Sequence, residues 1–387
     1  MNTPFGTGPL GTGPGALLLG RRRFLEVTAT GAVAVAAAGT VAGRRAWGQS
    51  ETVRWVSPRG TIEVLDDYPY WVAVQYGYFG DIETVLEPGP MDATATIKLV
   101  DQDQADFGYP SPGVFSLGLE QGIPLRSVWH MGAYDVFSFA FRKGERVADA
   151  GELAGKTILL GSIGWKAIVD PMLAQVGVDP ASVNYAEAGA GWAQALSQGQ
   201  GDAALSWEGL RAQWYGQGLD FDYILPYEFS QFPANSFVMR ESDYQDGGRQ
   251  DLYERYLRGW AMGLEFGHRN PRAATHIVLE RFPALASSLT PEVATESMMQ
   301  LAKVFRGDWE TRQGWGWHDF DQWQLYFDTI AEIGQVSRQI DPANVLSNDY
   351  VAAANDFDVA AIQADADGYE LPEEFQTVDV EAVRARL

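Results

Sequence analysis

Short apolar runs alternate with longer amphipathic stretches along most of the chain from residue 51 onward. The short runs are rich in β-branched and aromatic residues, which favours strands, and the longer stretches space their apolar residues as helices do. We expect strands at 52–56, 82–86, 105–109, 126–131, 136–142, 156–161, 183–186, 203–207, 223–225 and 236–239. We expect the intervening helices at 69–78, 92–100, 113–121, 166–175 and 190–198. Such alternation is typical of mostly parallel sheets that are covered by helices.

The strands and helices form two successive series, and the second begins with the strand at 156–161. Each series places a glutamine, a small residue and an aspartate directly before an apolar run, at 104–106 and again at 200–202. This echo suggests that the two series are built alike. We therefore expect two α/β lobes, one formed by 49–140 plus 233–387 and the other by 141–232, inserted between the halves of the first.

The chain beyond residue 239 has a helical pattern throughout. One apolar stripe passes through Leu252, Tyr256, Trp260, Gly263 and Leu264, and another passes through Leu325, Ile330 and Ile333. We expect these helices to complete the first lobe. The acidic segment 365–374 is expected at the surface or without fixed structure.

Residues 1–48 have the composition of an export segment rather than of a folded unit. Arg21, Arg22 and Arg23 precede a mildly apolar, alanine-rich stretch at 27–43. Two more arginines follow it, and then 46–48 offers small residues at the two positions that define cleavage. The arginine pair followed by phenylalanine and leucine resembles the twin-arginine signal. We therefore expect export to a periplasm-like space and cleavage near Gly48, with no membrane insertion of the mature chain.

Composition and charge exclude several classes of function. The chain has 28 basic and 51 acidic side chains and a formal net charge of −23, which disfavours nucleic acid and anionic lipid as partners. It has no cysteine, which excludes disulfides, thiolate metal sites and a cysteine nucleophile. No G-x-S-x-G motif is present, and the four histidines lack ligand-pair spacing. We therefore expect neither catalysis nor a cofactor, with a secreted cofactor-dependent or hydrolytic enzyme as the rival of another class.

Several segments resemble the solute-binding proteins that serve ABC importers for nitrate, sulfonates, taurine and thiamine-type pyrimidine precursors. The similar segments are 76–79, 104–108, 122–125, 149–161, 202–207 and 320–350, so that the resemblance covers roughly 50–355. It implies a type II periplasmic binding protein fold, in which two α/β lobes joined by two crossings close on a ligand. It also implies a small-molecule ligand, an ABC transporter permease as partner and a monomeric mature protein.

Candidate ligand-binding residues follow from the rule that open parallel sheets bind ligands beyond the carboxyl ends of their strands. Applied to both series and to the start of the first helix, this rule selects Arg59, Asp67, Trp71, Tyr109, Ser111, Asp135, Ser162, Trp165, Trp192, Trp207 and Glu208. Each has an ordinary alternative. Trp165 and Trp192 could simply pack the second lobe, and Asp135 and Glu208 could stabilise helix starts.

Aromatic residues dominate these positions, which suits a heterocycle or a cationic amine. Asp66, Asp67, Asp135 and Glu208 could accept hydrogen bonds from such a ligand. The same carboxylates would repel nitrate or a sulfonate unless Arg59 or Lys166 faced the anion. The sequence therefore favours an uncharged or cationic nitrogen-containing solute, with a small anion such as nitrate, a sulfonate or taurine as the alternative.

Overall fold

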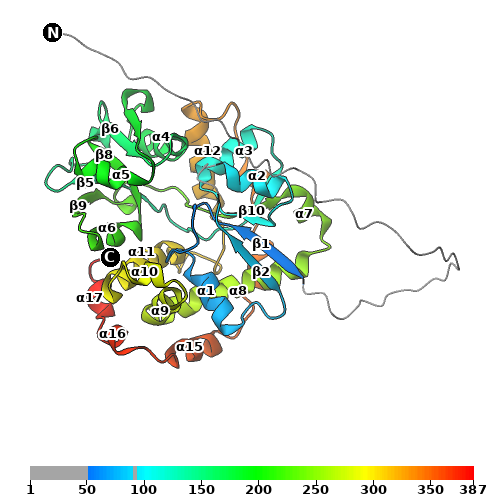
Figure 1. Cartoon of the computed structure of the whole chain (residues 1–387). Helices are drawn as coiled ribbons and strands as arrows, with labels where there is room; N and C mark the ends of the chain where they lie inside the picture. The colour runs from blue at the N-terminus through cyan, green and yellow to red at the C-terminus, as the bar shows by residue number, and fades with distance from the viewer. Residues whose placement is uncertain (1–50, 90–93) are drawn as a thin grey trace, which may run out of the picture. The chain divides into compact units, whose positions relative to one another are not determined.

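The structure is a computed structural model that describes residues 51–89 and 94–387 (Figure 1). The predicted export segment and its cleavage position near Gly48 lie outside the described residues. No helix in the described ranges is both long enough and apolar enough to cross a membrane.

The first sheet has the strand order β2-β1-β3-β10-β4. Strand β1 pairs in parallel with β2 and β3, whereas β10 is antiparallel to both of its neighbours. Its strands are β1 (Thr52–Val56), β2 (Glu83–Glu87), β3 (Phe107–Gly108), β4 (Leu125–Trp129) and β10 (Phe237–Arg240).

The second sheet repeats this plan in the order β7-β6-β8-β5-β9. Here β6 is parallel to β7 and β8, and β5 is antiparallel to β8 and β9. Its strands are β5 (Phe137–Arg142), β6 (Thr157–Leu160), β7 (Asn184–Glu187), β8 (Ala203–Trp207) and β9 (Phe221–Ile224). The sequence order suggested that β5 belongs to the first series, which is wrong, because both of its hydrogen-bonded partners lie in the second sheet.

The predicted echo between the two series has a structural counterpart. Asp106 donates its backbone N–H to the carbonyl oxygen of Arg54 in β1 at 2.9 Å, and its carboxylate accepts the Arg54 N–H at 2.7 Å. Asp202 makes the same pair of bonds to Thr157 of β6, both at 2.8 Å. In each sheet an aspartate therefore fixes the strand that follows it, β3 or β8, to the neighbouring parallel strand, β1 or β6.

Two connections join the sheets, one between β4 and β5 and the other between β9 and β10. They run side by side at Gly132, which donates its N–H to the carbonyl oxygen of Asn235 at 3.0 Å and accepts the N–H of Ala234 at 3.0 Å. The fold is thus the expected pair of mixed α/β lobes with two crossings. The exact residue limits of the lobes stay a prediction.

Helices cover the sheets and form the C-terminal part of the chain (Figure 1). Those between the strands are α1 (Tyr68–Tyr76), α2 (Ala95–Asp101), α3 (Pro112–Glu120), α4 (Lys166–Gln175), α5 (Trp192–Ser197) and α6 (Leu210–Gly216). Those after β10 are α7 (Glu241–Asp246), α8 (Gln250–Arg269), α9 (Pro271–Arg281), α10 (Pro283–Ala286), α11 (Pro291–Arg306), α12 (Phe320–Glu332), α13 (Pro342–Val345), α14 (Val351–Ala354), α15 (Val359–Asp367), α16 (Glu373–Gln376) and α17 (Val380–Arg384).

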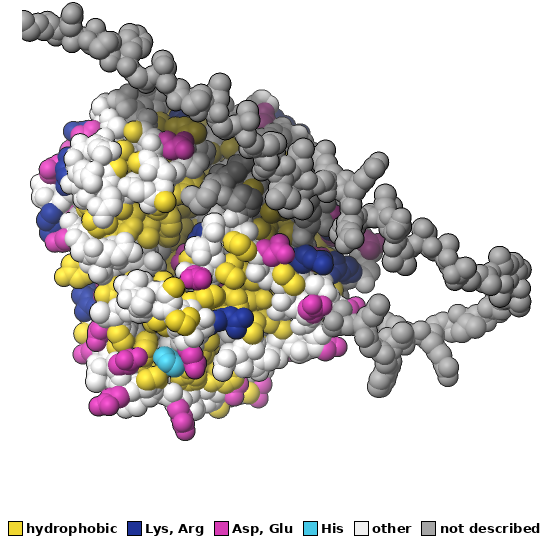
Figure 2. Space-filling view, viewed as in Figure 1, with side chains coloured by type: hydrophobic (Ala, Val, Ile, Leu, Met, Phe, Trp, Pro, Cys, Tyr) yellow, Lys and Arg dark blue, Asp and Glu magenta, His cyan; other side chains and the backbone are white. Residues whose placement is uncertain are grey.

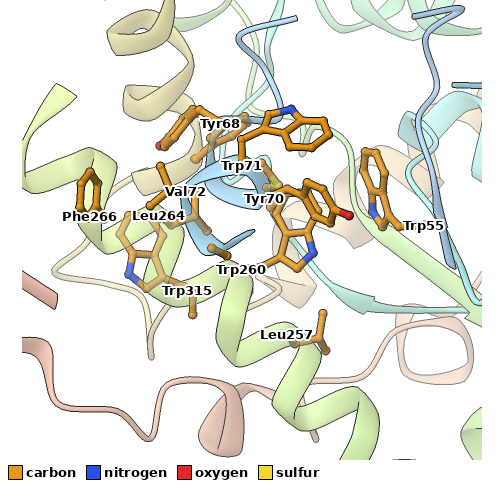
Figure 3. Close-up of a cluster of buried hydrophobic side chains, with 14 of the residues drawn as sticks. Trp55, Tyr68, Tyr70, Trp71, Val72, Leu257, Trp260, Leu264, Phe266 and Trp315 are labelled. Atoms are coloured by element: carbon orange, nitrogen blue, oxygen red, sulfur yellow. The ribbon is translucent and has the colours of Figure 1, made fainter. Parts of the chain in front are cut away.

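The largest core of the protein lies where α1 and α8 pack on the first sheet (Figure 3). A side chain at Gly263 of α8 would place its Cβ 2.0 Å from the carbonyl oxygen of Pro69, so glycine there lets the two helices approach closely. Trp260 is fully buried, and its ring centroid lies 5.3 Å from that of Trp55 and 5.7 Å from that of Tyr70. This aromatic core supports the start of α1 beneath the end of β1.

One sequence expectation for the C-terminal helices is wrong, whereas the expected surface position of the acidic segment 365–374 is confirmed. Leu325 is 39% exposed, because the buried face of α12 carries Trp323, Tyr326, Phe327 and Ile330 instead. The acidic segment 365–374 is at the surface but ordered. The carboxylate of Asp367 pairs with Arg269 at 2.6 Å, and that of Asp365 accepts a hydrogen bond from Tyr78 at 2.9 Å.

Candidate ligand-binding site

A cavity of about 110 Å³ lies between elements of the two sheets. Among the predicted residues, Arg59, Tyr109 and Ser111 line it from the first sheet, and Trp165 and Trp207 line it from the second. Hydrophobic side chains gather along the hollow between the elements of the second sheet and helices α9 to α11 (Figure 2). Residues far apart in the sequence thus converge on one apolar site.

On the first-sheet side, the guanidinium of Arg59 is held by two carboxylates. Its Nη2 donates to the fully buried carboxylate of Asp67, and its Nη1 lies 3.5 Å from Asp66. Asp66 lines the cavity, whereas Asp67 lies behind Arg59 rather than on the cavity wall. The positive charge of Arg59 is therefore compensated before any ligand enters.

The ionisation of these groups reflects burial and mutual attraction. Burial raises the pKa of Asp67 to about 6, and the attraction of Arg59 limits this rise. For Arg59, burial lowers the pKa and the carboxylates of Asp67 and Asp66 raise it, with a net rise. Burial also raises the pKa of Tyr109, which keeps its hydroxyl neutral. The polar end of the cavity therefore has the Arg59 guanidinium, the Asp66 side chain and the neutral Tyr109 phenol on its wall, with Asp67 behind Arg59.

Ser111 and Ser162 both use their hydroxyls as helix caps. Ser111 Oγ accepts from the N–H of Val114 at 3.4 Å at the start of α3. Ser162 Oγ accepts from the N–H of Gly164 at 3.4 Å in the turn of 3-10 helix Ile163–Trp165. Ser111 still lines the cavity, whereas Ser162 positions the turn that carries Trp165.

On the second-sheet side, three tryptophans form one cluster. The ring of Trp207 is perpendicular to that of Trp165, with centroids 5.9 Å apart, and stacked on that of Trp192 at 5.8 Å. Trp192 Nε1 donates to the carbonyl oxygen of Leu205 at 2.8 Å. Trp192 does not line the cavity, so it supports Trp207 from the far side of the ring.

Three other predicted residues lie away from the cavity wall. Trp71 packs against Phe282, with ring centroids 5.2 Å apart, and the guanidinium of Arg281 lies over its ring at 4.3 Å. Glu208 pairs with Arg211 at 2.9 Å at the start of α6. Asp135 is buried in the first crossing, as described below.

Sequence reasoning missed one whole wall of the cavity. Leu301, Val304 and Phe305 of α11 line it, together with Asn235 of the second crossing. The amphipathic pattern of α11 indicated only that one face is buried. No local signal showed that this face meets the strand ends of both sheets.

Helix α11 also contacts the chain immediately after Trp207. The N–H of Gly209 donates to Gln300 Oε1 at 3.0 Å, and its carbonyl oxygen accepts from Ser297 Oγ at 2.7 Å. Gly209 has φ of 90°, and a Cβ there would lie 2.6 Å from Leu301. The chain just after Trp207 is therefore fixed to α11 by two hydrogen bonds between the main chain of Gly209 and side chains of α11.

Asp135 links the two crossings and has a strongly shifted pKa. Its carboxylate accepts from the N–H of Phe137 at 3.0 Å and from Ser230 Oγ at 2.6 Å. Burial raises its pKa to about 7, and these two hydrogen bonds reduce the rise. Since the unfolded chain releases this proton near pH 4, the carboxyl should destabilise the fold progressively as pH rises from about 4 to about 7.

The variant Asp135→Asn should remove this pH dependence, because an amide can accept from Phe137 and donate to Ser230 without ionising. The free energy of unfolding of the variant minus that of wild type should grow by at least about 1 kcal/mol from pH 4.5 to pH 7.5, since a one-unit pKa shift corresponds to about 1.4 kcal/mol. Urea denaturation of both proteins across this range measures the difference. A constant difference would show that Asp135 ionises normally.

Similarity to known proteins identifies the class of this fold as that of the periplasmic binding proteins. A protein from Bordetella bronchiseptica RB50 shares 17% identity with a TM-score of 0.60, over 79% of this chain and 97% of its own. The alkanesulfonate-binding protein SsuA from Xanthomonas axonopodis pv. citri, bound to MOPS, shares 11% identity with a TM-score of 0.59, over 78% of this chain and 99% of its own. The periplasmic nitrate-binding protein NrtA from Synechocystis PCC 6803 shares 13% identity with a TM-score of 0.59, over 84% of this chain and 92% of its own.

The family follows from the sequence itself. The NMT1/THI5-like family model matches residues 66–274, which is more than half of the chain. The chain belongs to the NMT1/THI5-like family. No curated protein matches its sequence.

Proposed function

We propose that this protein is the periplasmic substrate-binding protein of an ABC importer, which captures a small solute between its lobes and delivers it to a membrane permease. The cavity between the sheets carries this proposal, because its walls come from both of them and include Trp165 and Trp207 on one side and Tyr109 on the other. Export on the arginine-rich segment, the permease and a monomeric mature chain are parts of the same proposal.

The solute that we favour is an uncharged or cationic molecule that contains nitrogen and an aromatic or apolar body. Tryptophan rings bind such bodies by stacking and attract cations over their faces. Asp66 supplies an acceptor at the polar end, while Arg59 is already paired with Asp67. An anion would have to lose its hydration next to two carboxylates, which is costly without a free cationic partner.

The alternative is the same role for a small anion such as nitrate, a sulfonate or taurine. It is favoured by the ligands named for SsuA and NrtA, and by one feature of Arg59. Its Nε is buried and has no hydrogen-bond partner among the described residues. An anion that displaced Asp66 could bond to this nitrogen.

The test begins with mass spectrometry of small molecules released from protein purified from its native periplasm. Thermal unfolding is then measured with 4-aminopyrimidine, choline, nitrate, taurine and MOPS, because a solute that binds the folded state raises the melting temperature with concentration. We expect stabilisation by the uncharged or cationic compounds and recovery of each compound unchanged.

Each other outcome has a definite meaning. Stabilisation by nitrate, taurine or MOPS alone would replace the favoured solute class with the anionic one. Consumption of the bound solute by the purified protein would contradict the receptor function and support a secreted enzyme.

A further inference from the structure

A second cavity, of about 310 Å³, lies among α8, α11 and α17 and away from the aromatic site. Its walls include Lys303 and Arg306 of α11, Arg384 of α17 and His268 of α8. Helix α17 packs beside α11 (Figure 1). Three permanent cations and a histidine thus share one cavity in a chain whose net charge is −23.

Internal pairing does not account for all of this positive charge. The Nη1 of Arg306 is buried and has no hydrogen-bond partner among the described residues. The nearby carboxylate of Glu265 instead accepts hydrogen bonds from Trp315 at 3.3 Å and from Gln363 at 3.0 Å. The guanidinium of Arg306 lies over the rings of Trp309, at 4.3 Å, and Trp315, at 5.6 Å, so its charge has aromatic faces rather than a paired carboxylate beside it.

The other cations have partial partners that leave donors available. Arg384 pairs through Nη1 with Glu381 at 2.6 Å, and both side chains are more than half exposed. Lys303 donates to a main-chain oxygen of Leu387, a residue that also lines the cavity, and lies over the ring of Tyr227 at 4.7 Å. An ammonium group has three donors, so Lys303 can bond to a further acceptor.

An ordinary explanation accounts for only part of this arrangement. Lys303 and Arg306 lie in the last turn of α11, where cations stabilise the helix dipole. The dipole of α11 explains neither why Arg384 of α17 lies beside these two residues nor why the three side chains line one cavity. Repulsion by Arg306 and Arg384 also adds to burial in lowering the pKa of His268, as expected where cations are incompletely neutralised.

We propose that the cavity lined by Lys303, Arg306 and Arg384 is a binding site for a small tetrahedral oxyanion of the phosphate or sulfate class. Guanidinium and ammonium groups that converge from two helices match the several oxygens of such an ion. The site is separate from the aromatic cavity, and it would bind its anion whatever the solute of that cavity is.

Isothermal titration of the full chain with inorganic phosphate at low ionic strength tests this site. We expect Lys303→Gln to weaken phosphate binding about tenfold, because a charge-assisted hydrogen bond of roughly 1.5 kcal/mol is lost. We expect Arg306→Gln to weaken it at least as much. Lys143→Gln is the matched control, because Lys143 is 62% exposed, pairs with Asp220 and Asp222 and directly follows β5 of the second sheet. The phosphate affinity of this variant should equal that of wild type.

The variant Arg306→Gln also loses the contact of the guanidinium with the Trp309 ring, 4.3 Å away, and could unfold for that reason. The exposed Lys303 therefore provides the decisive variant. Absence of phosphate binding to wild type, or equal affinity in Lys303→Gln and wild type, would overturn the site. Vesicles of phosphatidylglycerol form a second arm, and binding to vesicles without binding of free phosphate would overturn a small ion as the ligand.

Discussion

Replacing Trp260 by alanine should lower the free energy of unfolding by about 3–5 kcal/mol, the usual range for truncating a large buried aromatic side chain. Trp260 is fully buried and lies within 5.7 Å of the ring centroids of Trp55, Tyr70 and Phe237. Its Nε1 has no hydrogen-bond partner among the described residues, so the loss measures packing rather than a broken hydrogen bond. Figure 3 shows the cluster that would surround the vacated space.

Urea denaturation of the purified variant measures this loss. Trp260→Phe, which keeps an aromatic ring, should lose clearly less than Trp260→Ala. Tyr215→Ala is an exposed control, because Tyr215 is 67% exposed and surface substitutions usually change stability by less than about 0.5 kcal/mol. A loss below about 1 kcal/mol for Trp260→Ala would mean that α8 can repack against α1.

The same cluster connects the core to the aromatic cavity. The ring of Trp55, at the end of β1, lies 5.6 Å from the ring of Tyr109, which lines the cavity. Packing of the core thus determines the position of Tyr109 on the first-sheet side of the cavity. The same group of neighbouring aromatic rings therefore stabilises both the core and the first-sheet wall of the cavity.

Local patterns predicted the elements well where one signal dominated. The strands at 52–56 and 203–207 and the helix at 166–175 have the bounds that the sequence indicated. Strand β5 shows the limit, because its alternating residues mark a strand but not the sheet in which it pairs. Pairing depends on the two crossings, because the first carries the chain from β4 to β5 in the second sheet and the second returns it from β9 to β10 in the first sheet.

The candidate site was predictable only in part for a related reason. The rule of carboxyl strand ends selected Arg59, Tyr109 and Trp207, which line one cavity, and their contact with a ligand stays a prediction. It could not decide whether a polar residue at such an end faces the ligand or a neighbour. Asp67 and Glu208 are occupied by arginines, and the contribution of α11 depends on packing between segments almost 100 residues apart.

Replacing Trp207 by alanine should weaken solute binding by about 2 kcal/mol, or roughly thirtyfold, as expected for a central aromatic contact. Trp207 lines the cavity and is held from behind by Trp192 and, through Gly209, by the side chain of Gln300. A rigid ring of this kind supplies contact area with little loss of side-chain entropy. The effect should appear for either class of solute, because both must fill the same apolar space.

Titration of wild type and Trp207→Ala with 4-aminopyrimidine, and in parallel with MOPS, measures the change for whichever probe binds wild type. Trp207→Phe should recover part of the affinity, since it restores a flat ring against Trp165. Tyr227→Ala is the matched control, because Tyr227 is 59% exposed on the second-sheet part of the chain and lies outside the cavity wall. Equal affinity in Trp207→Ala and wild type, with both proteins folded by circular dichroism, would assign Trp207 to the packing of its own sheet and remove the second-sheet wall from the binding site.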